Sequence, residues 1–259
     1  MLYSEERKKK ILSYIDQHGR ASVQELGEAF AVSESTIRRD LSELENEKML
    51  KRTHGGAISK QSVNFEPSVI EKADRLLIEK QAIARKAASF IQDNDTVLID
   101  SGTTTLALIQ EIKLKNSLTV VTNSVVHAEL LKESNHIEVI VLGGRLRHET
   151  QALVGPLTDQ GLNLIHVDKA FIGTNGVDLH DGLTTPNLTE AATKRKMIEQ
   201  SSEVFLLADS SKFEKVSFAN FGEIESLDYC ITDEQVNEQY QIEFEQRGVK
   251  LEIVPLQED

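Results

Sequence analysis

The chain has 259 residues, of which 39% are hydrophobic and 27% charged, as in a soluble globular protein long enough for two domains. No apolar run is long enough to cross a membrane, and the N-terminus is polar and acidic, unlike a secretory signal, so we expect a cytoplasmic protein. The single cysteine, Cys230, excludes an intrachain disulfide, and the seven histidines show no metal-ligand spacing, so we expect no metal site.

The net charge of −13 is distributed unevenly along the chain. Residues 1–60 carry 11 Lys+Arg and 10 Asp+Glu, whereas the remaining residues carry 18 Lys+Arg and 32 Asp+Glu. Salt screens the repulsion between an acidic domain and a phosphate backbone beyond about 10 Å. A DNA-binding role for the N-terminal part must therefore rest on local contacts rather than on overall charge.

Two helical patterns follow each other near the N-terminus. The first helix is predicted from Glu5 to His18, with Gly19 at its left-handed end. Ser22 and Glu25 have the spacing of a capping box at the start of the second helix. The apolar face of this second helix consists of Val23, Leu26, Ala29 and Phe30.

A third helix, which begins after the N-cap Ser33, carries side chains that can read DNA. Ile37, Leu41 and Leu44 fall on one face, which leaves hydroxyl and guanidinium groups on the other. Such a face suits a major groove, because these groups bind phosphates and base edges. Charge alone favours the solvated face of an ordinary amphipathic helix, but the tandem caps and the short turn between the helices reverse that preference.

A basic hairpin is predicted directly after the third helix. Gly55 and Gly56 lie between two strand-like runs in Leu50–Ile58, and glycine accepts the positive φ of a tight primed turn. This hairpin would be the wing of a winged helix-turn-helix domain over residues 1–59. The candidate DNA-binding residues are Ser22, Ser33, Glu34, Ser35, Thr36, Arg38, Arg39, Lys51, Arg52 and His54.

The second domain is predicted over residues 71–259, after a linker at residues 60–70 that contains Pro67. It should begin with one helix from Glu71 to Ile91, followed by short apolar strands that alternate with helices. This alternation indicates a Rossmann-like α/β fold, with a largely parallel sheet covered on both faces. The predicted strands are 96–99, 118–121, 137–142, 170–172, 204–207 and 251–254, and the predicted helices are 105–112, 125–131, 189–200 and 234–247.

Small, hydroxyl-bearing and glycine residues follow five of these strands. Parallel strands end at one edge of the sheet, where ligands bind, so together these loops predict a polar pocket, although each alone is a weak signal. The loop from Ser101 to Thr105 leads into a helix whose first N–H groups can hold a phosphate. No GxGxxG or GxxxxGK[ST] motif is present, so we expect neither a dinucleotide nor a nucleoside triphosphate, and no cofactor.

The candidate effector-binding residues are Asp100, Ser101, Gly102, Thr103, Thr104, Thr105, Thr122, Asn123, Ser124, Gly143, Gly144, Arg145, Arg147, Gly173, Thr174, Asn175, Gly176, Lys194, Asp209 and Lys212. Of these, the residues expected to bind sugar hydroxyls are Asp100, Asn123, Asn175 and Asp209. Those expected to supply cations are Arg145, Arg147, Lys194 and Lys212.

The chain resembles the DeoR family of bacterial transcriptional repressors over nearly its whole length. The matching N-terminal residues are Arg7, Ile11 and Ile15, then Ser33-x-x-Thr36-Ile37-Arg38-Arg39-Asp40-Leu41, then Arg52-Thr53-His54-Gly55-Gly56-Ala57. The resemblance implies a sensor domain that is similar in fold to ribose-5-phosphate isomerase. It further implies a repressor that is released from operator DNA by a phosphorylated sugar. The segment from Ser33 to Ser42 is similar to members that control fructose uptake, which makes fructose 1-phosphate the first candidate.

An isomerase-like enzyme with an appended DNA-binding domain is the alternative. Asp100 to Thr105 resembles the isomerase phosphate loop, but Arg195 stands where the isomerase pattern has a catalytic carboxylate. A proton shuttle on an enediol needs such a carboxylate, so its loss favours a sensor without catalysis. Glu190 or Asp178 remains open as a substitute. In either case we expect a dimer or a higher even oligomer, because one winged helix covers about half of an operator.

Overall fold

The computed structural model describes residues 3–47, 49–59 and 68–256, and the chain divides into two compact units, residues 1–65 and 66–259. Most of the predicted linker, residues 60–67, lies outside the described residues. No described helix combines the length and the apolar character that a membrane span requires.

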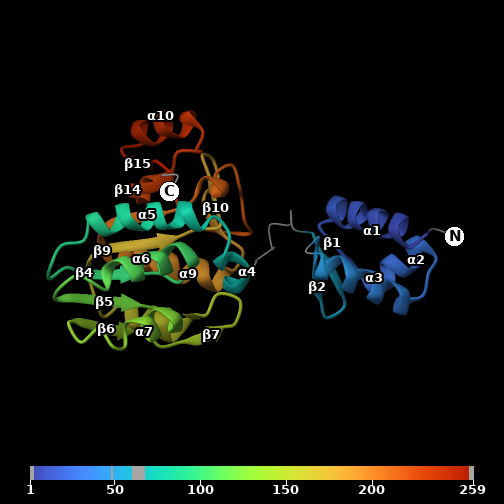
Figure 1. Ribbon diagram of the computed structural model, residues 1–259, viewed down its shortest axis with the longest axis horizontal. Helices are drawn as coiled ribbons and strands as arrows, with labels where there is room; N and C mark the ends of the chain where they lie inside the picture. The colour runs from blue at the N-terminus through green and yellow to red at the C-terminus, as the bar shows by residue number, and fades with distance from the viewer. Residues whose placement is uncertain (1–2, 48, 60–67, 257–259) are drawn as a thin grey trace. The chain divides into compact units, whose positions relative to one another are not determined.

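In its described part, the N-terminal unit has three helices and a three-stranded antiparallel sheet of order β1-β3-β2 (Figure 1). Ile11, Ile15, Leu26, Ile37 and Leu41 are fully buried in its core. The predicted winged helix-turn-helix fold is therefore confirmed. Its elements are α1 (Ser4–His18), β1 (Arg20–Ser22), α2 (Val23–Phe30), α3 (Glu34–Asn46), β2 (Lys51–Thr53) and β3 (Gly56–Ile58).

The wing differs from its predicted form. His54 and Gly55 make the turn, and neither Gly55 nor Gly56 has a positive φ, so the predicted left-handed glycines are wrong. Gly56 is required for a different reason: β3 also pairs with β1, a strand that the sequence pattern did not reveal. A Cβ on Gly56 would overlap the backbone of Ala21 and Ser22. In α2, the predicted apolar face is also incomplete, because Ala29 is exposed.

The predicted single helix from Glu71 to Ile91 is wrong. α4 (Val69–Ala73) starts inside the predicted linker and is separated from α5 (Leu77–Ser89) by a turn at residues 74–76. Leu76 has a left-handed backbone, with φ 52° and ψ 45°. The turn contains neither Gly nor Pro, and a left-handed non-glycine residue costs about 1–3 kcal/mol. Contacts from outside the turn must therefore stabilise the break.

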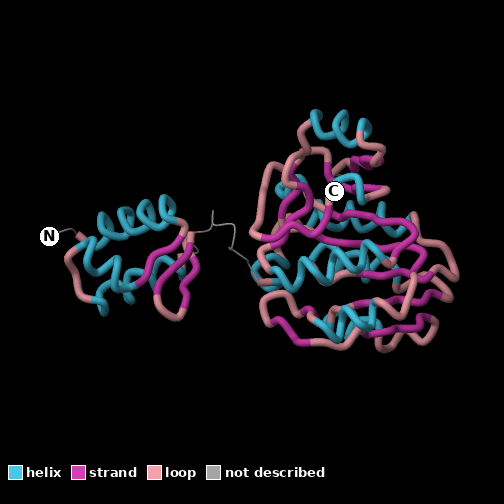
Figure 2. Tube along the Cα trace, turned by 180° about the vertical axis from the view of Figure 1, so that it is seen from behind, coloured by secondary structure: helices cyan, strands magenta, loops and turns pink. Residues whose placement is uncertain are grey.

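A seven-stranded parallel sheet, in the order β15-β14-β12-β9-β4-β5-β6, forms the centre of the C-terminal unit (Figures 1 and 2). The helices α5, α6 and α7 pack on one face of the sheet, and α8, α9 and α10 pack on the other. Phe171 and Phe205 belong to the first core, and the adjacent Ile172 and Leu206 to the second. Because both faces are buried, the strands are continuous apolar runs, and the predicted α/β fold is confirmed.

The bounds of the sheet strands and covering helices agree with most of the predicted ranges, but β14 and α8 were missed. They are β4 (Thr96–Ile99), α6 (Thr103–Ile112), β5 (Leu118–Thr122), α7 (Val125–Leu131), β6 (Ile137–Val141), α8 (Pro156–Leu162), β9 (Val167–Gly173), α9 (Leu188–Glu199), β12 (Ser201–Leu207), β14 (Tyr229–Asp233), α10 (Glu238–Gln246) and β15 (Lys250–Val254).

Several small elements that were not predicted lie in the loops after the strands. They are β7 (Arg145–Arg147), β8 (Ala152–Val154), β10 (Gly176–Asp178), β11 (Gly182–Thr185), β13 (Ala219–Gly222) and the short 3-10 helices η1 (Ser210–Lys212) and η2 (Ile224–Ser226). β7 and β8 form a hairpin, and β10, β11 and β13 form a small antiparallel sheet. The carboxyl ends of the parallel strands share one edge of the large sheet, which is called the rim here.

Candidate DNA interface and effector site

The first turn of α3 is closed by hydroxyl groups. The Ser33 hydroxyl accepts a hydrogen bond from the Thr36 amide at 3.3 Å, and it lies 2.9 Å from the hydroxyls of both Ser35 and Thr36. Ser33 and Ser35 are exposed. This arrangement places several small donors and acceptors at the N-terminal end of the helix, the end that recognition helices present to base edges.

Two guanidinium groups extend from the exposed face of α3. The side chains of Arg38 and Arg39 are 50% and 67% exposed, and they lie 3.1 Å from Glu34 and 3.9 Å from Glu43. Exposed ion pairs of this kind contribute only about 0–1 kcal/mol. Both arginines can therefore exchange their carboxylate partners for phosphates or base edges at little cost.

Two further predicted DNA-binding residues, Ser22 and Arg52, also hold elements of the domain together. The Ser22 hydroxyl and the Glu25 carboxylate form the predicted capping box of α2. Arg52 donates to the Ser42 hydroxyl at 2.6 Å, which ties the wing to α3. Of the remaining wing residues, Lys51 is half-buried and His54 is exposed at the turn.

A buried ion pair joins α1 to α3. Arg7 donates through Nε and a terminal nitrogen to the two carboxylate oxygens of Asp40, at 2.6 and 3.0 Å. Asp40 is fully buried. The hydrogen bonds to Asp40 raise the pKa of Arg7. The pair sets the position of α3 relative to α1.

At the rim of the C-terminal unit, an ion pair holds the loop after β4. The Asp100 carboxylate accepts from the Gly173 amide at 3.1 Å and pairs with the Lys194 ammonium, which also donates to the Gly173 carbonyl at 2.9 Å. Burial raises the pKa of Asp100, and Lys194 opposes that rise. Lys194 therefore has a different role from the free cation expected from the sequence: it ties β4 to β9.

Three more predicted residues hold neighbouring loops together. The Asn123 amide accepts from the Ser101 N–H and donates to the Leu153 carbonyl, both at 3.1 Å. The Thr122 hydroxyl donates to the Ile99 carbonyl at 2.7 Å. Ser124 caps α7. These groups keep the β4 loop in place rather than facing an open site.

The other predicted rim residues also contact one another. Arg147 lies 2.9 Å from Glu190, which also accepts from the Thr150 hydroxyl at 2.5 Å, whereas Arg145 is exposed. The Thr174 hydroxyl and the Asn175 amide oxygen bond to groups of β10 and β11. A Cβ on Gly144 would overlap the Thr158 hydroxyl, which donates to the Gly143 carbonyl. Gly144 therefore permits close packing of the loop after β6.

The start of α6 keeps unused donors. Among the described residues, the amides of Thr103, Thr104 and Thr105 donate no hydrogen bond, and the first bond of the helix comes from Leu106 to the Gly102 carbonyl. The Thr105 hydroxyl donates to that same carbonyl at 3.1 Å. Three free amides at a helix start form a site for an anion, favoured by the helix dipole.

A second set of incompletely paired groups follows β12. Asp209 is fully buried, and its Oδ2 has no hydrogen-bond partner in the described part of the chain. The Lys212 ammonium lies 3.7 Å from that oxygen. A buried carboxylate oxygen without a donor is unusual and marks a position where a ligand hydroxyl would be stabilised.

Lys80 is a rim residue that the sequence analysis missed. It is 4% exposed, and its ammonium donates to the carbonyls of Lys72 and Arg75 at 2.5 Å each. Burial lowers its pKa to about 8, and among nearby charges Asp209 raises that pKa and Lys212 lowers it. The order of the elements could have identified this position. α5 leads into β4 at the amino edge of the sheet, so the start of α5, where Lys80 lies, must be at the rim.

The comparison with family models covers both units. The model of the DeoR-like helix-turn-helix domain matches residues 7–63, and that of the DeoR C terminal sensor domain matches residues 77–234. The chain belongs to the DeoR family.

Individual relatives of this DeoR-family chain match it over most of its length. It is 40% identical over 228 residues to the "Uncharacterized HTH-type transcriptional regulator FruR" of Bacillus subtilis, which covers 88% of the chain and 90% of that protein. It is 38% identical over 232 residues to the "Lactose phosphotransferase system repressor" of Staphylococcus epidermidis, with 88% and 91% covered. This DeoR-family protein is therefore a DNA-binding transcriptional regulator.

Solved structures resemble part of the DeoR-family chain more distantly. Ribose 5-phosphate isomerase A from Methanocaldococcus jannaschii is 17% identical, with a TM-score of 0.39, over 52% of this chain and 53% of that chain. The two carboxylates considered as catalytic substitutes are both engaged. Glu190 binds Arg147 and Thr150, and Asp178 accepts from the amides of His180 and Asp181 at 2.8 and 3.0 Å. Arg195 is exposed and donates to the Asn220 carbonyl.

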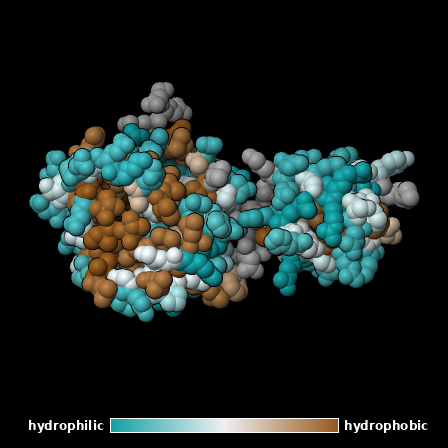
Figure 3. Space-filling model, turned by 90° about the horizontal axis from the view of Figure 1, so that it is seen from below, coloured by the Kyte–Doolittle hydropathy of each residue, from teal (hydrophilic) through white to brown (hydrophobic). Residues whose placement is uncertain are grey.

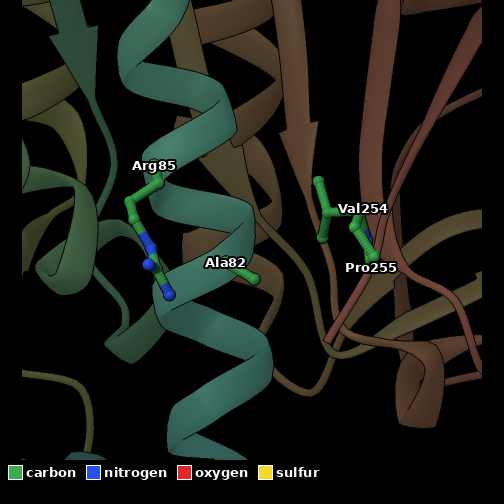
Figure 4. A pocket seen from close by; sticks show the side chains of 4 residues that line it. All are labelled: Ala82, Arg85, Val254 and Pro255. Carbon is green, nitrogen blue, oxygen red and sulfur yellow. The ribbon is translucent and has the colours of Figure 1, made fainter. Parts of the chain in front are cut away.

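A cavity of about 200 Å³ lies between α5 and the end of β15 in this DeoR-family sensor unit (Figure 4). Its described lining consists of Ala82, Arg85, Val254 and Pro255. This lining offers one guanidinium group and otherwise apolar side chains, with no carboxylate or hydroxyl for sugar oxygens among the described residues. The rim groups suit a phosphorylated sugar better.

Proposed function

We propose that this protein is the repressor of a sugar-catabolism operon and that a phosphorylated sugar releases it from its operator. In this proposal residues 1–59 bind operator DNA and residues 71–259 bind the sugar phosphate. The observation that carries the proposal is the pair of unused polar groups at the rim: three free amides at the start of α6, and the buried Asp209 beside Lys80 and Lys212. One group suits a phosphate and the other a sugar hydroxyl.

The spacing of the strands supports a ligand that reaches both groups. The order β12-β9-β4 separates the ends of β12 and β4 by two strand spacings, about 10 Å. A phosphorylated hexose is comparable in length. In the proposed pose its phosphate accepts from the amides of Thr103 to Thr105, and a hydroxyl donates to Asp209 while Lys212 supplies positive charge. Fructose 1-phosphate is the first candidate, and the repressor role is in line with the name of the Staphylococcus relative.

The proposal excludes an isomerase. Enediol chemistry needs a carboxylate free to move a proton at the substrate carbon. Glu190 is 5% exposed, and its Oε1 is held by both Arg147 and Thr150. The buried Asp100 is paired with Lys194. Asp209 is placed to accept a hydroxyl hydrogen, but we assign it binding rather than proton transfer.

The protein is further proposed to act as a dimer or a higher even oligomer, since one winged helix covers only about half of an operator. We assign the interface between subunits to the edge strand β6. Its Ile140 and Val141 are 38% and 44% exposed, and β7 and α7 add the exposed Leu146 and Val125. Figure 3 shows hydrophobic residues gathered on the side of this unit seen from below, where β6, α7 and β7 lie in Figure 1.

A gel shift with labelled promoter DNA, alone and with sugar phosphates, tests the repressor proposal. We expect fructose 1-phosphate or another phosphorylated sugar to release the DNA, and the unphosphorylated sugar not to. Incubation with ribose 5-phosphate should produce no ketose. DNA binding that no sugar phosphate alters, or ketose formation at an enzymatic rate, would contradict the proposal.

The phosphate position is tested by Thr104→Asp, which places a carboxylate where the phosphate is expected, with the neutral Thr104→Asn as the matched control. The Thr104→Asp protein should lose its response to sugar phosphate, whether the carboxylate excludes the effector or imitates it. If the carboxylate excludes the effector, DNA affinity is retained. If it imitates the effector, DNA affinity is lost. A Thr104→Asp protein released at the wild-type concentration would place the phosphate elsewhere.

A further inference from the structure

The break between α4 and α5 lies in a segment whose sequence favours a continuous helix. The residues from Lys72 to Lys80 are Lys-Ala-Asp-Arg-Leu-Leu-Ile-Glu-Lys, without Gly or Pro. Leu76 nevertheless has a left-handed backbone, and Leu76, Leu77 and Ile78 are 37%, 49% and 57% exposed. Burial of these side chains therefore does not explain the break.

The Lys80 ammonium replaces hydrogen bonds that the break removes. In a continuous helix the Lys72 carbonyl would accept from the Leu76 amide, and the Arg75 carbonyl from the Glu79 amide. In the structure both carbonyls accept from Lys80 Nζ at 2.5 Å, and the Lys72 carbonyl also accepts from the Asp74 and Arg75 amides of the turn. Over the described residues, the amides of Leu76 to Glu79 donate no hydrogen bond. Lys80 is thus the side chain that satisfies the acceptors left by the break.

The same ammonium belongs to the rim. Asp209 and Lys212 are the largest charge influences on Lys80, and burial lowers its pKa to about 8. An anion or a polar ligand that binds at Asp209 and Lys212 would compete with two neutral carbonyls for Lys80, and charged acceptors form stronger hydrogen bonds than neutral ones. A ligand at the rim would therefore act on the position of Lys80.

We propose that Lys80 is the switch between the rim and the DNA-binding unit: a bound sugar phosphate draws its ammonium away from the break, and α4 and α5 then join into one helix. The ligand class rests on the proposed function, whereas the role of Lys80 rests on the break itself. Joining the helices redirects α4, which is the first described element after residues 60–67, and breaks the bond from the Val69 amide to the Glu149 carbonyl. The ligand acts through its differential affinity for the two helix states.

Hydrogen–deuterium exchange of the full-length protein tests this switch without a ligand. Lys80→Met removes the ammonium but keeps a chain of similar length. The four amides from Leu76 to Glu79 should become protected, because they acquire helical acceptors. Lys86→Met is the matched control: Lys86 lies on the same helix, and its ammonium pairs with Glu252 at 2.8 Å, so no protection should appear. Unchanged exchange in Lys80→Met, or loss of protection throughout α4, would overturn the proposal.

A second pair of variants at Leu76 remains informative if Lys80→Met does not fold. Leu76→Gly accepts the left-handed backbone, whereas Leu76→Ala does not, and both remove the same exposed side chain. This difference in backbone preference between the two variants should change the equilibrium between broken and joined helices by about five- to thirty-fold. The amides from Leu76 to Glu79 should be more protected in Leu76→Ala. Equal protection in the two variants would overturn the proposal.

Adding fructose 1-phosphate to the wild-type protein then connects the switch to the effector. Protection of the Leu76 to Glu79 amides should rise over the concentrations that release DNA. Release of DNA without any such protection would overturn the switch and leave the repressor proposal standing. Protection in Lys80→Met together with DNA binding that no sugar phosphate affects would support the switch and reject the proposed effector class.

Discussion

Each unit has one buried ionisable group that makes it sensitive, to substitution in the N-terminal unit and to pH in the C-terminal unit. In the N-terminal unit this group is Asp40, and in the C-terminal unit it is His127, which is 1% exposed. His127 lies beneath the β4 loop, with Nδ1 3.4 Å from the Thr122 hydroxyl. Burial lowers the pKa of His127 to about 4, against the raising effect of a hydrogen bond to the Gly102 backbone.

Removing one partner of the Arg7–Asp40 pair should strongly destabilise the N-terminal unit. Arg7→Met leaves a buried carboxylate without its counter-ion, which costs about 3–5 kcal/mol. Amide exchange in α1 and α3 measures the loss. The exposed Arg38→Met is the control, because its pair with Glu34 contributes at most about 1 kcal/mol. The double variant Arg7→Met, Asp40→Leu should recover stability. If Arg7→Met behaves like Arg38→Met, the pair is not a stabilising feature.

His127 should make the C-terminal unit less stable in mild acid. Its pKa is depressed from an ordinary value of 6.5, so the unfolded chain binds a proton between about pH 6.5 and 4 while the folded protein does not. Stability is therefore complete above pH 6.5 and falls as the pH drops, by roughly 3 kcal/mol at about pH 4. Urea midpoints should fall less steeply between pH 6.5 and 5 in His127→Gln than in the wild type. The exposed His180→Gln should keep the wild-type dependence, and an unaltered slope in His127→Gln would reject this assignment.

At the scale of elements, α3 combines a buried face with an exposed basic face. Ile37 and Leu41 are fully buried, whereas Arg38 and Arg39 project from the same turns. The break between α4 and α5 shows the opposite situation, since its sequence favours a continuous helix but the Lys80 side chain bonds to carbonyls of the break. Recognition by α3 can therefore be tested by substitutions on the exposed face of α3, whereas a test of the switch requires the whole C-terminal unit.

Arg38→Ala and Arg39→Ala should weaken operator binding with little effect on folding. Loss of a base-edge contact costs about 1–3 kcal/mol and relaxes specificity at one position, whereas loss of a phosphate contact weakens binding to all sequences equally. Titration with operator DNA and with scrambled DNA distinguishes a base-edge contact from a phosphate contact. Lys10→Ala is the control, because Lys10 is also an exposed cation with an i−4 partner, Glu6 at 3.5 Å. Operator affinity that is unchanged in both arginine variants would remove α3 as the recognition helix.

At the scale of the whole molecule, the two edges of the large sheet differ. The β15 edge carries Lys250 and Glu252, charges that discourage pairing with another strand. The β6 edge has the sequence Ile-Glu-Val-Ile-Val, with one charge. In an antiparallel pair of two β6 strands centred on Val139, Glu138 would face Ile140 of the second copy, so no like charges oppose each other. Two β6 edges can therefore pair without like charges facing each other.

Ile140→Glu should convert the proposed dimer to monomers, because the introduced carboxylate would face Glu138 of the second copy, and like charges directly opposite each other destabilise a strand pair. Ile253→Glu, on the β15 edge and with the same 38% exposure, should leave the oligomeric state unchanged. Analytical ultracentrifugation at micromolar concentration measures both. A wild-type monomer, or a dimer that persists in Ile140→Glu, would refute the assigned interface.

By itself, the sequence determined the elements that depend on local signals. The capping residues Ser22 and Ser33, the 3.6-residue spacing of Ile37, Leu41 and Leu44, and the apolar runs of the sheet strands are all readable from neighbours in the chain. These signals identified the winged helix-turn-helix, the parallel sheet and the loops of its rim. Helix caps, apolar periodicity and continuous apolar runs each depend only on residues within a single helix or strand, so the sequence shows them directly.

Only the tertiary structure decided which polar residues are committed and where the local rules fail. Lys194 and Asn123 were indistinguishable in sequence from ligand-binding residues, but they hold Gly173, Ser101 and Leu153 in place. The break at Leu76 opposes its local helix propensity because Lys80 satisfies the exposed carbonyls. The contacts of Lys194 and Asn123 join residues that are brought together only by the fold, whereas Lys80 acts within its own segment, through a side-chain geometry that sequence spacing does not show.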